Sequence, residues 1–246
     1  MFDEREIEPD HNSILYTKMV NIIQVDGIIG AGKSYFIEHI LVPALTDAGY
    51  RVKVIREPVD QWDDILPLFY ADKKRWASQF QMYALVDRIA VIKQAIQDHD
   101  QIDFYISERG ITSDRLFMEV LYKEGNVTEM EMIRYGKWWN QWYSHMPVCP
   151  KTVIYLNTDI DVCMERVKSR ARNGELCEED SEDSGGVSKE YQLMLQAEHN
   201  SRYAGKTKIE LVTWIKSNVV EITDVKNIDD WKVDIMTKLT PLLAAA

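Results

Sequence analysis

The chain has 246 residues, of which 46% are hydrophobic and 28% are charged, and its net charge is −11. A length of this order suits one α/β domain, and so acidic a surface disfavours duplex nucleic acid and anionic membranes as partners. No apolar run reaches the ~20 residues of a membrane span, and the three cysteines form no CxxC pair that would indicate a zinc or redox site.

The first 19 residues predict a flexible polar tail. This tail starts with acidic residues, whereas signal and transit peptides start with basic ones. We therefore expect a cytoplasmic protein whose thiols stay reduced.

Strands and helices alternate along the rest of the chain. Short β-branched runs predict strands at 20–25, 51–56, 103–107, 152–156 and 219–222. Amphipathic patterns and end signals predict helices at 33–48, 76–98, 114–123, 128–145, 161–170 and 230–239. This order predicts an α/β fold with a five-stranded parallel sheet flanked by helices, in one domain over 20–246. The acidic, Ser- and Gly-rich stretch 175–186 predicts a mobile surface loop.

The helix at 128–145 is rich in aromatic residues. Thr128 and Glu131 have the spacing of a capping box, which predicts where this helix starts. Such a helix face is typical of a core or of a subunit interface rather than of a ligand site. The apolar residues that recur at helical spacing are Met132, Tyr135, Trp139 and Trp142.

The first predicted strand leads directly into a glycine-rich loop. Residues 27–34 (GIIGAGKS) match G-x-x-x-x-G-K-[ST] between a predicted strand and a predicted helix. Backbone N–H groups in such a loop surround phosphate oxygens, helped by the positive end of the helix dipole. We expect Lys33 to reach the β- and γ-phosphates and the Ser34 hydroxyl to bind Mg²⁺. The phosphate-binding residues are then Gly27, Gly30, Ala31, Gly32, Lys33 and Ser34.

The second predicted strand is followed by a carboxylate. Glu57 comes after 51–56 and before Pro58, which favours an extended backbone at Glu57. The carboxyl ends of parallel strands face the ligand, so Glu57 is expected beside the phosphates. A carboxylate there is a metal ligand or a base for an incoming hydroxyl, and spacing alone favours neither over a solvated glutamate.

Several motifs after the phosphate loop resemble those of the deoxynucleoside kinase family, which includes the deoxycytidine, deoxyguanosine and mitochondrial thymidine kinases. The resemblance extends from about residue 21 to 203. It implies a P-loop kinase fold with an arginine-rich lid at about 166–187, and transfer of the γ-phosphate of ATP to the 5′-hydroxyl of a deoxyribonucleoside. The motifs are REPVDQW at 56–62, Tyr70 before KKRW, Phe80-Gln81, SERG at 107–110, SDR at 113–115, and Arg166, Arg170, Arg172 and Glu175.

The resemblance implies a catalytic role for three residues. Glu57 is the expected base for the 5′-hydroxyl proton, and Arg109 steadies that hydroxyl and the transferring phosphate. Lys33 holds the donor phosphates, and Glu108 joins Ser34 in holding Mg²⁺. Carboxylate, hydroxyl and cationic groups of this kind suit in-line phosphoryl transfer.

The resemblance also implies substrate contacts. The expected nucleoside-binding residues are Tyr70 and Glu175 at the sugar 3′-hydroxyl, Gln81 at the base edge, and Trp62 and Phe80 around the base. Arg166, Arg170 and Arg172 are expected to bind phosphate, although a solvated basic helix end would show the same arginine spacing.

Arg88 and Asp114 match positions at which deoxycytidine and deoxyguanosine kinases carry Arg and Asp. An Arg–Asp pair beside the base crowds the space of a thymine methyl group. We therefore expect deoxyadenosine, deoxyguanosine or deoxycytidine to be preferred over thymidine. Gly110 departs from the family pattern, which usually has Ser at that position.

Two alternatives remain at this point. A nucleoside monophosphate kinase of the thymidylate kinase type would share the phosphate loop and the arginines, but would need basic residues where Glu57 stands. A catalytically silent nucleotide-binding relative would be free to lose Lys33, Glu57 and Arg109, all of which are present. The resemblance further implies a homodimer.

Overall fold

The computed structural model describes residues 20–144, 148–170, 175, 186–212, 215–223 and 228–243. The predicted N-terminal tail, Arg172 and most of the acidic stretch 175–186 lie outside these described residues.

A six-stranded sheet forms the centre of the fold, in the order β2-β3-β1-β4-β6-β5. The first five strands in this order are parallel, as predicted, whereas β5 pairs antiparallel with β6. The prediction missed β5 because this short edge strand (KIELV) carries charges and lacks a run of apolar residues. The strands are β1 (Val20–Asp26), β2 (Val52–Ile55), β3 (Phe104–Glu108), β4 (Val148–Leu156), β5 (Lys208–Val212) and β6 (Ile215–Ile222).

The first helix is interrupted by a π-type segment. It comprises α1 (Lys33–Phe36), the π segment Ile37–Leu41 and α2 (Val42–Asp47), and together they match the single helix predicted at 33–48. Pro43 has no N–H to donate to the preceding turn, which accounts for the widened hydrogen-bond pattern just before it.

The remaining helices include two that the sequence prediction missed. These are α3, which is short, and α8, which follows the stretch expected to be a loop. The others agree with the predicted helices within a few residues. Their bounds are α3 (Leu66–Ala71), α4 (Lys73–Ala95), α5 (Ile111–Lys123), α6 (Glu129–Ser144), α7 (Ile160–Arg170), α8 (Lys189–Tyr203) and α9 (Ile228–Leu243).

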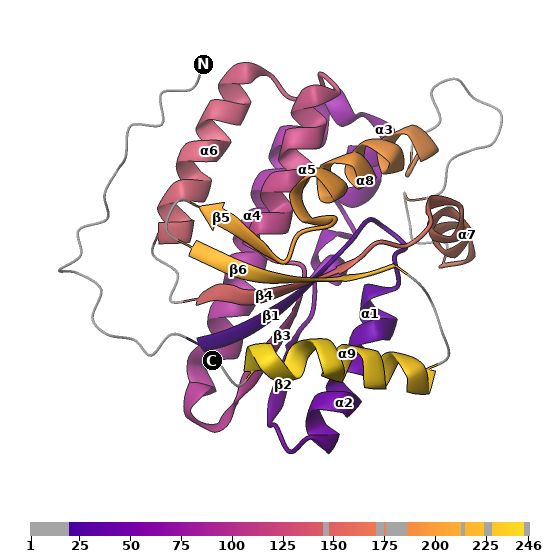
Figure 1. Ribbon diagram of the computed structural model, residues 1–246. Coiled ribbons are helices and arrows are strands. Elements are labelled where there is room, and N and C mark those ends of the chain that lie inside the picture. The colour runs from indigo at the N-terminus through magenta and orange to yellow at the C-terminus, as the bar shows by residue number, and fades with distance from the viewer. Residues whose placement is uncertain are drawn as a thin grey trace.

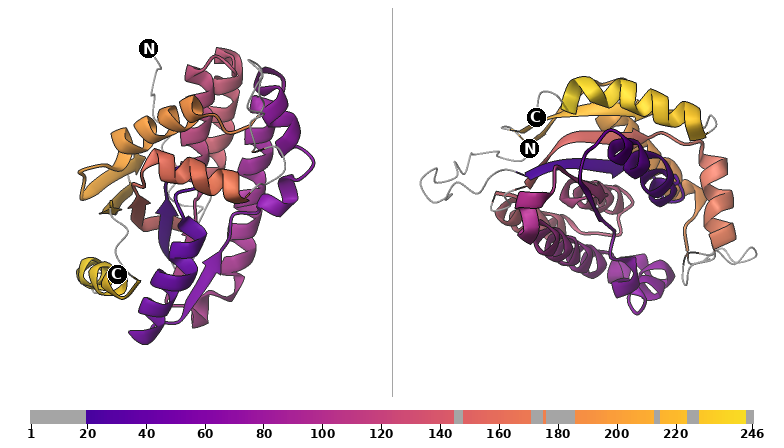
Figure 2. Two further views of the ribbon diagram at one scale, coloured as in Figure 1. Left: turned by 90° about the vertical axis from the view of Figure 1, so that its right-hand side faces the viewer. Right: turned by 90° about the horizontal axis from the view of Figure 1, so that it is seen from below.

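Helices cover both faces of the sheet. Figure 1 shows α1, α2 and α9 on one face and α4, α5 and α6 on the other, and the views in Figure 2 agree. The capping box predicted for α6 is confirmed, because Thr128 N–H donates to Glu131 Oε2 at 2.8 Å and Glu131 N–H donates to Thr128 Oγ1 at 3.3 Å. In the described part of the chain, no helix is long and apolar enough to cross a membrane.

The aromatic face of α6 lies in the core. Tyr135 and Trp139 are each 1% exposed, which confirms the interpretation of this stripe as a core face. Trp139 Nε1 donates to the Ile111 carbonyl at 2.8 Å, which ties α6 to the start of α5. The packing of α6 on α5 thus holds the residues that follow β3 in place.

Candidate active site

Three neighbouring parallel strands end at the same place. β2, β3 and β1 are adjacent in the sheet, and their carboxyl ends lead to Glu57, to Glu108 and Arg109, and to the loop that starts at Gly27. The register pairs Ile55 with Ser107 and Val25 with Glu108, so these ends lie level. The sheet therefore brings the predicted phosphate loop, base and metal ligand to one edge.

The phosphate loop depends on glycines for its shape. Gly30 and Gly32 have φ angles of 82° and 89°, which favour glycine. A Cβ atom on Gly30 would stand 2.3 Å from the Cys163 carbonyl oxygen, so no other residue fits there. The loop is closed by Lys33, whose Nζ donates to the carbonyls of Ile28 at 3.0 Å and Gly27 at 3.4 Å.

Lys33 is buried, and this affects its charge. Burial first, and then the nearby Arg109 charge, lower the pKa of the Lys33 ammonium to about 8. Next to it, Ser34 Oγ donates to Glu108 Oε1 at 2.8 Å, which brings together the two predicted magnesium ligands.

Glu57 is held by two guanidinium groups. Its Oε1 lies 2.6 Å from Arg88 Nη2 and 3.4 Å from Arg109 Nε. Burial alone would raise the pKa of Glu57, but the charges of Arg109, Arg88 and Lys33 outweigh burial and lower it to about 2. Glu57 is therefore a carboxylate at neutral pH.

Asp114 holds Arg88 from the opposite side. Its carboxylate accepts hydrogen bonds from Arg88 Nη1 and from the Tyr135 hydroxyl. Burial raises the pKa of Asp114 to about 6, and the Glu57 charge also raises it. Arg88 and Tyr135 lower this pKa, but by less than burial raises it. Two carboxylates thus share one guanidinium, and their environments move their pKa values apart.

A cavity of about 260 Å³ opens between the phosphate loop and α3, α4 and α8. Asp114 does not line it and instead lies behind Arg88. Gly27, Ala31, Gly32 and Arg166 also do not line it. The predicted site residues that do line it are Gly30, Lys33, Ser34, Glu57, Trp62, Tyr70, Phe80, Gln81, Arg88, Glu108, Arg109, Arg170 and Glu175.

Aromatic rings form one wall of this cavity. Trp62 meets Phe80 edge-on with a centroid distance of 5.5 Å, and Phe69 stacks on Phe80 at 4.7 Å. The Trp62 indole is anchored by its Nε1–H, which donates to Asp87 Oδ2 at 2.8 Å. Such a wall offers flat apolar surfaces to a planar ligand.

Two polar atoms near this wall lack partners. Among the described residues, Gln81 Oε1 and Arg88 Nε are buried and accept or donate no hydrogen bond. Gln81 is 2% exposed and lines the cavity. A buried polar atom without a partner is costly, so these atoms indicate a place for a polar ligand.

The predicted arginine-rich lid is not confirmed. Arg166 Nη1 donates to the backbone carbonyls of Ala31 at 3.2 Å and Gly30 at 3.4 Å, so it binds the phosphate loop itself. Arg170 lines the cavity and pairs with Glu175 at 2.6 Å, whereas Arg172 lies outside the described residues.

Residues of α8 that were not predicted from the sequence complete the site. The Gln192 side chain binds the backbone of Ile29 twice, donating to its carbonyl at 2.6 Å and accepting from its N–H at 3.2 Å. Tyr191 lines the cavity. The four-residue spacing of the buried residues Tyr191, Leu195, His199 and Tyr203 is a helical pattern that would have revealed this element.

The limited space around residue 110 explains why this position holds a glycine. A Cβ atom there would lie 2.5 Å from Gln24 Oε1. That oxygen is held in place by Thr112 Oγ1, which donates to it at 3.0 Å. The Gln24 amide therefore fills the position where a residue 110 side chain would begin.

Comparisons with known proteins identify the family. A family model described as deoxynucleoside kinase matches residues 23–244. The chain is 32% identical over 156 residues to a probable deoxycytidine kinase of Fowlpox virus, covering 62% of this chain and 63% of that protein. It is 30% identical over 165 residues to the mitochondrial thymidine kinase 2 of Homo sapiens, covering 63% of this chain and 57% of that protein. This chain thus spans less than two thirds of the length of both relatives.

Two further proteins match over more of their length. Deoxycytidine kinase 2 of Gallus gallus is 28% identical over 249 residues, covering 89% of this chain and 86% of that protein. A solved structure, deoxyadenosine kinase from M. mycoides with bound dCTP, has a TM-score of 0.66 at 22% identity, covering 89% of this chain and 99% of that chain. This structural likeness shows a shared fold. Because the family model matches most of the sequence, the chain belongs to the deoxynucleoside kinase family.

Proposed function

We propose that this protein transfers the γ-phosphate of ATP to the 5′-hydroxyl of a deoxyribonucleoside. The observation that carries the proposal is one cavity that is lined by a phosphate loop, by the largely buried carboxylate of Glu57 and by an aromatic wall. Lys33 and Ser34 stand on the donor side and Glu57 on the acceptor side. The arginines closest to Glu57 are already paired with carboxylates, which suits a neutral hydroxyl acceptor better than a phosphate.

The proposed mechanism is in-line transfer. Glu57 is ionised at neutral pH and takes the proton that the 5′-hydroxyl loses as the new P–O bond forms. Lys33 exchanges the loop carbonyls for donor phosphate oxygens when the triphosphate binds, and Arg109 stabilises charge on the transferring group. Arg170, which lines the same cavity, adds a third cation.

Magnesium fits the donor side of the cavity. Ser34 Oγ and Glu108 Oε1 lie 2.8 Å apart and both residues line the cavity. Hydroxyl and carboxylate oxygens suit Mg²⁺, which takes its other ligands from substrate phosphates and water. When bound, the ion would neutralise charge on the triphosphate.

The base preference we propose is for deoxyadenosine, deoxyguanosine or deoxycytidine over thymidine. Gln81 Oε1 is a buried acceptor without a partner among the described residues, and it suits an exocyclic amino group. Adenine, guanine and cytosine carry such a group, whereas thymine does not. Arg88 adds bulk beside the base, because its guanidinium lies 4.9 Å from the Trp62 ring centre and is fixed by Asp114 and Glu57.

Substrate assays test the reaction and the preference together. Purified protein is incubated with Mg-ATP and each of the four deoxyribonucleosides, with thymidine monophosphate as a fifth acceptor, and the products are separated by chromatography. We expect 5′-monophosphates from the three nucleosides with amino-bearing bases and little from thymidine. Efficient thymidine phosphorylation would refute the preference alone, and transfer only to the monophosphate, or to nothing, would refute the proposed reaction.

We also propose a homodimer. Large apolar side chains are exposed on two neighbouring helices, namely Tyr83 and Val86 on α4 and Met130 and Trp138 on α6, with exposures of 47% to 59%. Light scattering during gel filtration measures the mass, and Trp138→Glu is expected to shift a dimer towards monomer. A monomeric wild type would refute this proposal. The cytoplasmic location stays a prediction, since the human relative is named mitochondrial.

A further inference from the structure

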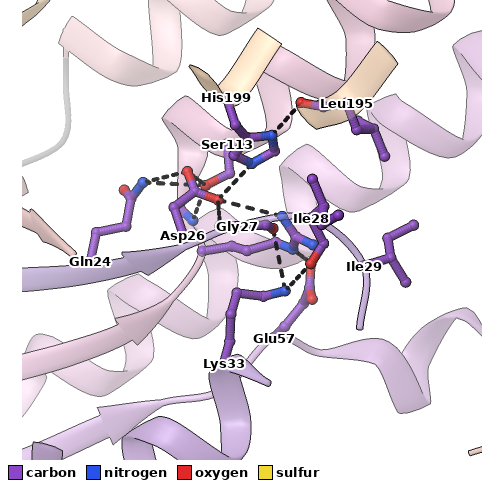
Figure 3. Close-up of polar contacts among 12 residues, drawn as sticks. Gln24, Asp26, Gly27, Ile28, Ile29, Lys33, Glu57, Ser113, Leu195 and His199 are labelled. Atoms are coloured by element: carbon purple, nitrogen blue, oxygen red, sulfur yellow. Dashed lines mark hydrogen bonds and ion pairs between the residues drawn. The ribbon is translucent and has the colours of Figure 1, made fainter. Parts of the chain in front are cut away.

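Asp26 is the last residue of β1 and is fully buried directly before the phosphate loop. Figure 3 shows its carboxylate surrounded by polar groups from several elements. Burial alone would raise the pKa of Asp26, but His199, Arg109 and the Gly27 N–H hold it well below its usual range. On Oδ1 the partners are Gly27 N at 2.9 Å, His199 Nε2 at 3.3 Å and Arg109 Nη1 at 3.4 Å, and on Oδ2 they are Ser113 Oγ at 2.9 Å, Tyr203 Oη at 3.0 Å and Gln24 Nε2 at 3.3 Å.

Arg109 lies between Asp26 and Glu57. Its Nη1 faces Asp26 and its Nε faces Glu57, each at 3.4 Å, while the guanidinium carbon lies 4.6 Å from the Phe117 ring centre. This arginine is the one non-glycine residue in the described part of the chain with a positive φ angle, 61°. A non-glycine residue keeps such a backbone only where its surroundings hold it.

Contacts from β1 and β3 hold this backbone. The Arg109 N–H donates to the Val25 carbonyl at 2.9 Å, and the Arg109 carbonyl accepts from the Ser107 hydroxyl. Asp26 adds the contact that orients the side chain. The backbone conformation of Arg109 and its ion pair with Asp26 together therefore set the position of the guanidinium.

His199 connects this carboxylate to α8. Its Nδ1 lies 2.7 Å from the Leu195 carbonyl and its Nε2 faces Asp26. A carbonyl only accepts, so Nδ1 donates to the Leu195 carbonyl, and this bond orients the ring with Nε2 towards the Asp26 carboxylate. Seven residues before His199 on the same helix, Gln192 binds Ile29 of the phosphate loop. One face of α8 thus contacts the phosphate loop and the carboxylate behind Arg109.

We propose that Asp26, held in place by His199, is a positioning residue that holds the Arg109 guanidinium between Asp26 and Glu57, next to the phosphate loop. This inference rests on the proposed kinase function. Without the Asp26 charge, Arg109 would move towards Glu57, its other carboxylate partner. It would then be misplaced for the transferring phosphate, while the contacts that bind ATP and nucleoside would remain.

The first test is Asp26→Asn, which keeps the size of the side chain and removes its charge. We expect kcat to fall ~30- to 100-fold, with KM for ATP and nucleoside changed less than about threefold. Tyr155→Phe is the matched control, because it removes a buried hydroxyl that donates to Asn200 at 2.7 Å and makes no hydrogen bond to Asp26 or Arg109. A kcat for Asp26→Asn within about threefold of the wild type would overturn the proposal.

A double-mutant cycle separates positioning from general support of the fold. If Asp26 acts through Arg109, Asp26→Asn should lower kcat by less than about threefold in a protein that already carries Arg109→Lys. Multiplicative losses in kcat would overturn the proposal. If Asp26→Asn does not fold, His199→Gln replaces it in the cycle, because glutamine keeps a hydrogen-bond donor on a side chain of similar length. We expect His199→Gln to lower kcat about tenfold in the wild type and to have little further effect in the Arg109→Lys background.

A readout that needs no activity keeps this inference distinct from the proposed function. The Nε–H signal of Arg109, followed by NMR in protein labelled with ¹⁵N-arginine, reports how the guanidinium is held. We expect it to shift or broaden in Asp26→Asn and to stay unchanged in Tyr155→Phe. If the wild type phosphorylates no nucleoside, the proposed function fails, while an Arg109 signal that Asp26→Asn leaves unchanged refutes the positioning role itself.

Discussion

The two sides of the cavity differ in how their polar groups are satisfied. On one side, charged residues from the strand ends, α4 and α5 alternate in sign and each has a partner of opposite charge: Asp114, Arg88, Glu57, Arg109 and Asp26 form a largely buried series of ion pairs. On the side of α3 and α4 the wall is aromatic, and Gln81 Oε1 is left without a partner among the described residues, as is Nε of Arg88, the α4 residue that borders both sides.

This difference shows two ways of preparing a site. A group that must act on the reacting atoms is held in position by neighbours before any substrate arrives, because reorganisation during the reaction would raise the barrier. A group that must recognise a ligand keeps an unsatisfied atom for it, because a partner within the protein would compete with the ligand. Substitutions on the charged side should therefore lower kcat, and substitutions on the aromatic side should raise KM for the nucleoside.

Removing the carboxylate on the charged side is expected to have the largest effect. Glu57→Gln should lower kcat by about 10²- to 10⁴-fold, the range typical of a general base, with a smaller change in KM for the nucleoside. Steady-state kinetics with the preferred nucleoside measure it. Asp64→Asn, an exposed carboxylate that follows the same strand, is the control and should keep its activity. Turnover near that of the wild type in Glu57→Gln would contradict the assigned role.

On the aromatic side, Gln81→Leu should act on binding. The substitution keeps the side-chain size and removes the free acceptor, which corresponds to about 1–3 kcal/mol of lost interaction with the base. We expect KM for the nucleoside to rise ~10- to 100-fold with kcat changed much less. Gln94→Leu, an exposed position on the same helix, controls for the added apolar surface. A selective fall in kcat would mean that Gln81 belongs with the charged side instead.

The match between Gln24 and Gly110 can be tested by stability. Gly110→Ser should lower the free energy of unfolding by roughly 1–3 kcal/mol, because its Cβ would displace the Gln24 amide. Adding Gln24→Ala should recover part of this loss by opening space. Urea unfolding measures both variants. Gly136→Ala should leave stability equal or higher, because among the described residues no atom outside the adjoining helix backbone lies within 4 Å of the new Cβ. If Gly110→Ser leaves the free energy of unfolding unchanged, the Gln24 side chain can move aside without loss of stability, and the explanation for Gly110 is wrong.

The smallest expected effect concerns Lys33. Its pKa of about 8 leaves about half of the ammonium groups neutral at pH 8, and a bound triphosphate would raise that pKa. ATP binding at pH 8 should therefore take up roughly half a proton, and affinity should rise as the pH falls from 9 to 7. Calorimetry in two buffers of different ionisation enthalpy measures the uptake. Lys33→Arg, which stays charged, should show none of this uptake.

Local patterns were enough to predict much of the fold. The strand, glycine loop and helix around Lys33 were predicted because each signal depends on neighbouring residues, and the five parallel strands followed from the alternation of elements. Glu57 was expected beside the phosphates because the carboxyl ends of parallel strands meet at one edge, whereas Glu108 and Arg109 were expected there only from the family resemblance. The short α3, the charged edge strand β5 and α8 were missed because their patterns are brief or dominated by polar residues.

The order of the elements and the residues at the strand ends can be predicted from the amino-acid sequence, since both depend on local propensity and on motifs. Which charges pair with one another depends on how distant elements pack in three dimensions. Asp26 meets His199, and Glu57 meets Arg88, across separations of 173 and 31 residues. No local pattern encodes such contacts. They arise because burial in a low-dielectric core makes each carboxylate stable only where packing brings donors and cations to it.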